Sequence, residues 1–70
     1  MPIFVIWTEP DTNYPSACHE KGVEPLTKMH EEEGLVVSEE FEADTPEEAF
    51  AYHKAKTNEF FSSVKNKGNP

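Results

Sequence analysis

Residues 41–50 read Phe-Glu-Ala-Asp-Thr-Pro-Glu-Glu-Ala-Phe, and this stretch decides the fold because it joins the end of a strand to the start of a long helix. Thr45 and Glu48 have the spacing of a capping box. In that motif the hydroxyl accepts from the backbone N–H three residues on, and the carboxylate reaches back to the N–H of Thr45. Pro46 falls at the first helical position, where its fixed φ favours the helix and its missing N–H costs nothing. A helix is therefore predicted to begin at residue 46.

Downstream of this start, apolar and weakly polar residues recur at helical spacing and form one stripe: Ala49, Phe50, His53, Thr57, Phe60, Phe61 and Val64. Acidic residues in the first turn, and Lys65 and Lys67 near the last, complement the helix dipole. Gly68 is expected to end the helix. We therefore expect a helix over about 46–66 and a frayed tail at 67–70.

Upstream of the helix, residues 35–43 are predicted to form a strand with Leu35, Val37, Phe41 and Ala43 on one face. Glu39 interrupts this apolar face. An inward-pointing charge discourages edge-to-edge pairing of sheets, so this strand is expected at a sheet edge.

The first strand is predicted over residues 2–8, which are rich in β-branched and aromatic side chains on both faces. The single long helix can cover only one of these faces, so the other must meet a loop, a short helix or a second subunit. Phe60 and Phe61 are consecutive and cannot both face the same core. These observations predict a homo-oligomer, dimer or higher, with Phe4, Ile6 and Phe61 as interface residues.

Two connecting segments remain. Residues 9–22 are rich in turn formers and are predicted to be a long loop. Residues 25–33 are predicted to form a short helix, since Pro25 stands in a first-turn position and Gly34 provides a stop. Three glutamates at the negative end of the dipole argue against this helix, and a strand over 26–30 followed by a hairpin turn is the alternative.

These elements predict one domain over residues 1–70 of the α+β class. It is a small two-layer domain, in which a two- to three-stranded antiparallel sheet (strands near 2–8 and 35–43) is packed by one C-terminal amphipathic helix. Cys18 is the only cysteine, so no disulfide forms within the chain. A lone thiol fits a reducing compartment, and no leader or membrane segment opens the chain, so a cytoplasmic protein is expected.

The net charge is −8, from fourteen acidic residues against six lysines and no arginine. Residues 31–48 contain nine of the acids and no base. Such a surface repels nucleic acid and anionic membranes and attracts basic protein surfaces. The alternative is that the acidity serves only solubility. The predicted partner-binding residues are Glu31, Glu32, Glu33, Glu39, Glu40, Glu42 and Asp44.

Candidates for chemistry are few. Cys18 and His19 could form a nucleophile–base pair or ligate a metal. Adjacent residues seldom point both side chains at one place, however, and no second cysteine offers metal-ligand spacing. The acidic stretch lacks the alternating spacing of a calcium loop. His53 is interpreted as a core-edge residue with one hydrogen bond, and the aromatic residues, without interleaved arginines, as core. No phosphate-binding loop, catalytic triad or dinucleotide motif is present. We therefore predict no catalytic, cofactor or metal site, and no enzyme.

We predict a small acidic interaction protein or inhibitor that docks its 31–48 face on a basic protein surface. One form of this hypothesis is that the acidic face imitates the charge of a nucleic-acid backbone. Small inhibitors, including phage-encoded ones that occlude nucleic-acid-binding sites, share this size and acidity, which is a likeness of type alone. The alternative is a homo-oligomer that binds a nucleotide or metabolite in a pocket at the subunit interface, built with the 9–22 loop. A metal-dependent activity at the acidic cluster is a third hypothesis. No motif indicates a family.

Overall fold

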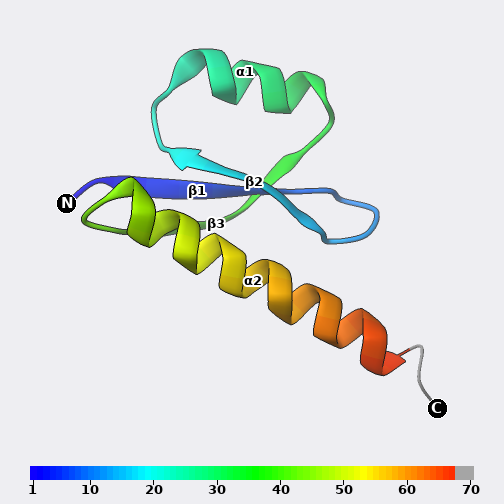
Figure 1. The fold of residues 1–70 in the computed structure, drawn as a ribbon. Helices are drawn as coiled ribbons and strands as arrows, with labels where there is room; N and C mark the ends of the chain where they lie inside the picture. Colours follow the sequence, from blue (N-terminus) through cyan, green and yellow to red (C-terminus); the bar gives the residue numbers. More distant parts are fainter. Residues whose placement is uncertain (68–70) are drawn as a thin grey trace.

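The computed structural model describes the backbone of residues 1–67 and the side chains of residues 1–63. The elements are β1 (Ile3–Thr8), β2 (Pro15–Glu20), α1 (Glu24–Glu32), β3 (Val36–Glu42) and α2 (Pro46–Lys67). The strands form one antiparallel sheet in the order β2-β1-β3, with β1 at its centre. Figure 1 shows α1 on one side of this sheet and α2 on the other. The α+β class, the antiparallel sheet and the C-terminal helix are confirmed.

Strand β2 lies inside the segment that was predicted to be a loop, and that prediction is wrong for residues 15–20. A tight connection closes the β1–β2 hairpin: the N–H of Asn13 donates to Glu9 O at 2.8 Å, and the N–H of Glu9 donates to Tyr14 O at 3.0 Å. Asn13 has a φ of 65°, a left-handed conformation that asparagine tolerates. Strand β2 carries little apolar character of its own, and β1 supplies the apolar partners.

The two faces of β1 are covered by different helices. Phe4 packs with Ala43, which precedes α2, and with Ala49 in the first turn of α2, and its ring stacks 6.0 Å from that of Phe41. On the other face Trp7 is 3% exposed and lies under α1, 5.4 Å from the ring of His30. The helix predicted at 25–33 is thus confirmed, and it supplies the cover that a second subunit would otherwise have to give.

This arrangement corrects the predicted oligomer interface. Phe4 and Ile6 are 2% and 1% exposed within the single chain, on the side of the sheet that faces α2. Neither side chain is available to a second subunit. Phe61, by contrast, is 55% exposed on α2, so the expectation that one of the two consecutive phenylalanines is peripheral is confirmed.

Strand β3 is an edge strand, as predicted. The register shifts where Ile6 faces Glu39 while Trp7 faces Val37, so Ser38 is an extra residue in a β-bulge. The bulge changes the predicted faces: Val37 lies on the α1 side with Trp7, whereas Glu39 and Phe41 lie on the α2 side. Bulges and inward charges both hinder pairing at a sheet edge.

The start of α2 has the predicted capping box in a slightly altered form. The N–H of Glu48 donates to Thr45 Oγ1 at 3.2 Å, and Glu48 Oε2 accepts from the N–H of Asp44, one residue before the predicted donor, at 3.2 Å. Helix α2 continues to Lys67. The predicted stop at Gly68 and the rest of the frayed tail lie outside the described residues. Over the part of the chain that is described, no helix combines the length and the apolarity needed to cross a membrane.

We expect Thr45→Ala to lower the free energy of unfolding by about 1 kcal/mol, because it removes the hydroxyl that satisfies the Glu48 N–H. Urea unfolding followed by circular dichroism measures the change. Ser62→Ala, on the exposed surface of the same helix, is the control and should not destabilise the protein. Equal stability of Thr45→Ala and the wild type would contradict a working cap.

Candidate functional site

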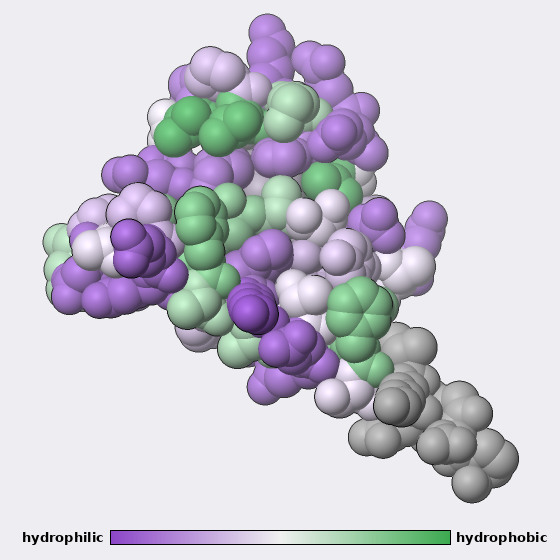
Figure 2. All heavy atoms as spheres, in the orientation of Figure 1, coloured by the Kyte–Doolittle hydropathy of each residue, from purple (hydrophilic) through white to green (hydrophobic). Residues whose placement is uncertain are grey.

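The predicted acidic face is divided by β3. Glu39 lies opposite Ile6 and points to the α2 side, whereas Glu40 and Glu42 lie opposite Val5 and Ile3 on the α1 side. Alternation along the strand produces this split, because successive side chains point to opposite faces. In Figure 2 hydrophilic side chains dominate the visible face, and hydrophobic ones appear as separate patches among them. The residues of the 31–48 stretch therefore do not form one surface.

A cleft of about 290 Å³ lies between α1 and the sheet. Its floor is apolar and consists of Val5, Trp7 and Val37. Its rim has three carboxylates and one amine, contributed by Glu24, Glu31, Glu40 and Lys21. Lys21 Nζ lies 3.1 Å from Glu40 Oε1 in an exposed ion pair. We call this hollow the acidic cleft.

Of the predicted binding residues, Glu31 and Glu40 line the acidic cleft, and Glu42 lies on the same face of β3. The others are placed elsewhere. Glu32 is exposed at the end of α1, Glu33 contacts His30, Asp44 donates its backbone N–H to Glu48, and Glu39 faces α2. Glu24 was missed. It lies about two helical turns before Glu31 and therefore on the same face of α1, but the helix was predicted to begin only at residue 25, which left Glu24 out.

Helix α1 rests on the sheet through a cluster of three rings. Trp7 Nε1–H donates to His19 Nε2 at 2.7 Å, and His19 Nδ1 lies 2.8 Å from Glu20 O. An indole N–H can only donate, so His19 Nε2 must be unprotonated and Nδ1 must carry the proton. The ring of His30 stacks 5.5 Å from that of His19. Among the residues of α1, all of which are described, His30 alone is buried.

The pair Cys18 and His19 does not form a nucleophile and base. Cys18 lies opposite Ile6 and packs against the core under α2, while His19 lies opposite Val5 and faces α1. Burial raises the pKa of the Cys18 thiol, which makes the thiolate scarcer. Within the described residues no group of three or more His, Cys, Asp or Glu side chains is placed to hold a metal ion.

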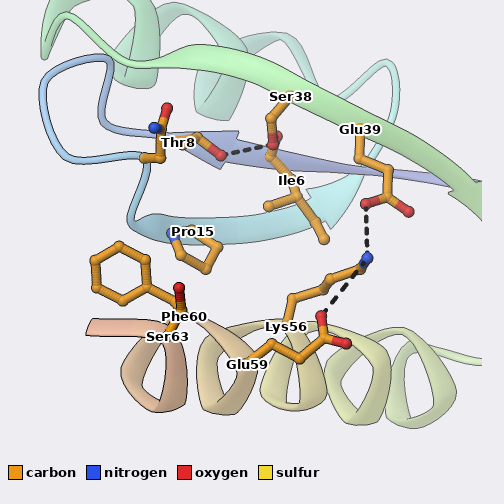
Figure 3. Close-up of a pocket in the computed structure, with 10 residues that line it drawn as sticks. Ile6, Thr8, Pro15, Ser38, Glu39, Lys56, Glu59, Phe60 and Ser63 are labelled. Atoms are coloured by element: carbon orange, nitrogen blue, oxygen red, sulfur yellow. Dashed lines mark hydrogen bonds and ion pairs between the residues drawn. The ribbon is translucent and has the colours of Figure 1, made fainter. Parts of the chain in front are cut away.

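A second cleft, of about 370 Å³, lies between α2 and the sheet (Figure 3). Its polar wall contains the Thr8 hydroxyl, which donates to Ser38 Oγ at 2.6 Å, and Ser38 in turn donates to Ile6 O at 3.4 Å. Its apolar wall is formed by Ile6, Pro15 and Phe60. We call it the α2 cleft. It includes Asn13 and Pro15 from the segment predicted to build a ligand pocket, and it belongs to a single chain.

Charged groups line one end of the α2 cleft. Lys56 Nζ lies 3.6 Å from Glu39 Oε1 and 3.9 Å from Glu59 Oε2. The Tyr52 hydroxyl donates to Glu39 Oε2. This hydrogen bond raises the pKa of Tyr52, because the ionised tyrosine would lose the bond and face a carboxylate. The charge of Glu39 likewise raises the pKa of Lys56, so Lys56 stays protonated.

His53 has the structural role predicted for it. Its Nε2 donates to Pro15 O at 2.7 Å and ties α2 to the first residue of β2. The ring is partly buried, and the group that it bonds is a backbone carbonyl. His53 therefore holds a helix in place.

Comparison with known proteins gives no match: no family model, no curated protein and no solved structure is significantly similar to this chain.

Glu39→Gln is expected to lower the pKa of Tyr52 towards its ordinary value of 10.0, since the carboxylate is the main cause of the upward shift. Because the pKa of Tyr52 is higher in the folded than in the unfolded protein, the Tyr52–Glu39 bond stabilises the fold fully at pH values below the pKa of unfolded tyrosine. This stabilisation is lost as the pH rises through the pKa of Tyr52 in the folded protein. Ultraviolet titration of tyrosinate in a Tyr14→Phe background isolates Tyr52. Glu59→Gln is the control and should leave the pKa of Tyr52 unchanged. A titration that Glu39→Gln does not move would contradict the bond.

Proposed function

We propose that this protein binds a basic segment of a partner protein in the acidic cleft between α1 and the sheet. The observation that carries the proposal is the combination of three carboxylates with an apolar floor in one hollow. Lysine and arginine side chains have apolar stems and charged ends, so they can lay the stem on the exposed side chain of Val37 and bring the charge to the rim.

The charge around the cleft supports this partner. Three carboxylates exceed the single amine of Lys21, which is itself paired with Glu40. The whole chain has a net charge of −8, so its long-range field attracts basic surfaces and speeds their encounter. Val37 is 44% exposed, which leaves apolar area for an incoming side chain to bury.

A protein that ordinarily binds nucleic acid presents such a basic surface. In this form of the proposal the protein acts in the cytoplasm as an inhibitor that occupies the partner's nucleic-acid site. Duplex DNA would then compete with it for the partner. The division of the acidic residues between the two faces of β3 limits the imitation of a nucleic acid to the α1 side.

The double variant Glu31→Lys/Glu40→Lys is expected to weaken binding of a basic probe by about tenfold or more, because it reverses two of the three rim charges. The probe is a short labelled peptide in which arginine alternates with leucine, measured by fluorescence anisotropy. Affinity of the wild type should also fall between about 50 and 500 mM salt. A peptide of arginine and serine tests the apolar floor and should bind more weakly.

Asp11→Lys/Glu59→Lys is the matched control, since it changes the net charge equally at exposed positions away from the acidic cleft. If both double variants weaken binding to the same extent, only the net charge matters and the acidic cleft is not the site.

A second candidate function is favoured by the α2 cleft, whose volume of about 370 Å³ falls within the range of small-molecule sites. Two carboxylates and one amine give its charged end a net negative charge, which disfavours a phosphate. The ligand class that fits is an uncharged ring compound with hydroxyl groups, such as a nucleoside, placed between Phe60 and the hydroxyls of Thr8 and Ser38.

We expect uncharged nucleosides to shift the NMR signals of residues in the α2 cleft at about millimolar concentration, and nucleoside monophosphates to shift them less. Phe60→Ala should abolish these shifts. Phe50→Ala removes an exposed ring from the same helix outside the cleft and should leave them intact. Absence of any shift at the cleft with every uncharged compound would remove this second function.

A further inference from the structure

The contact between α1 and the sheet depends on histidine. His30 is the one buried residue of α1. Its ring is tilted against that of Trp7 at a centroid distance of 5.4 Å and stacks on that of His19 at 5.5 Å. The same helix supplies Glu24, Thr27 and Glu31 to the acidic cleft. The geometry of the cleft is therefore set by how His30 sits on these two rings.

We propose that α1 is a pH-released cover: protonation of the His19–His30 pair detaches α1 from the sheet and dismantles the acidic cleft. This inference rests on the proposed function where it concerns binding, and on the structure alone where it concerns α1. Histidine is the side chain that ordinarily changes charge between about pH 5 and 8, so the change falls in a physiological range.

Protonation of His19 is incompatible with its present bonds. Its Nε2 accepts from the Trp7 indole and its Nδ1 donates to Glu20 O. A proton added to Nε2 would place two N–H donors 2.7 Å apart, in a residue that is 8% exposed. The Trp7 N–H would lose its acceptor, and the new charge would be buried without a carboxylate partner.

The groups that surround His19 do not offset this charge. From β1 the ring meets Trp7, which does not titrate. From α1 it meets His30, whose Nδ1 lies 3.0 Å from Glu33 Oε1. Glu33 can hold one proton on His30, but a second charge on the stacked ring of His19 is then repelled. Glu20 and Lys21 follow His19 in the chain, and both are exposed.

The decisive experiment uses the free protein. We expect the amide protection factors of α1 to fall about tenfold between about pH 7.5 and pH 5.5, while those of β1 are retained, because only α1 is released. The single tryptophan, Trp7, should report the same transition in its fluorescence. His53→Gln is the control for the third histidine and should keep the transition, whereas His19→Gln should abolish it.

Two results would overturn the proposal: protection of α1 that does not change between these pH values, or a fall that is the same for α1 and β1. The wild type and His53→Gln suffice for this decision if His19→Gln fails to fold. A transition that persists unchanged in a folded His19→Gln would also overturn it.

Peptide binding measured at two pH values distinguishes this inference from the proposed function. The arginine–leucine peptide should bind about tenfold more weakly at about pH 5.5 than at about pH 7.5. If the peptide fails to bind even at the higher pH, the proposed function is wrong, while the protection factors of α1 still decide whether α1 is released. If it binds equally at both values, the cleft does not depend on the docking of α1.

Discussion

The structure depends on β1, a central strand whose side chains are apolar on both faces. Phe4 and Ile6 point to one side, and Val5 and Trp7 to the other. Burying such a strand requires a cover on each face, and a chain of 70 residues has room for two helices. The remaining strands flank β1, and each helix leaves a hollow where its cover of the sheet ends.

The two covers differ in kind. Helix α2 starts close to the sheet because Ala43 and Ala49 are small, and the rings of Phe4, Phe41 and Tyr52 stack in series beside them. Helix α1 is short and polar, and it buries only His30. The apolar cluster of Phe4, Ala43 and Ala49 thus lies on the α2 side. On the α1 side the helix is held to the sheet mainly through His30, and the cleft beside it has an acidic rim. This side is therefore suited to binding a basic partner and to responding to a change in pH.

Local signals in the sequence predicted β1, β3, α1 and the start of α2, because strand composition and capping residues act over a few neighbours. Strand β2 could not be predicted this way, since Pro15–Glu20 is polar and gains its place from pairing with β1. The bulge at Ser38 was equally hidden, and it moved Val37 to the α1 side. Charge alone was the basis for predicting Glu31 and Glu40 as binding residues, and both line the acidic cleft. Their approach to Glu24 around one cleft depends on the long-range packing of His30 on Trp7, which no local pattern reveals.

Chemical-shift mapping of the labelled protein during titration with the arginine–leucine peptide tests most directly whether the α1 side is the binding side. Binding in the acidic cleft should move the signals of Gly22, Thr27, Val37 and Trp7, residues that all line that hollow. Phe60 and Ser63, in the α2 cleft, should stay in place. Shifts centred on the α2 cleft, or spread evenly over all exposed carboxylates, would contradict the role assigned to the acidic cleft.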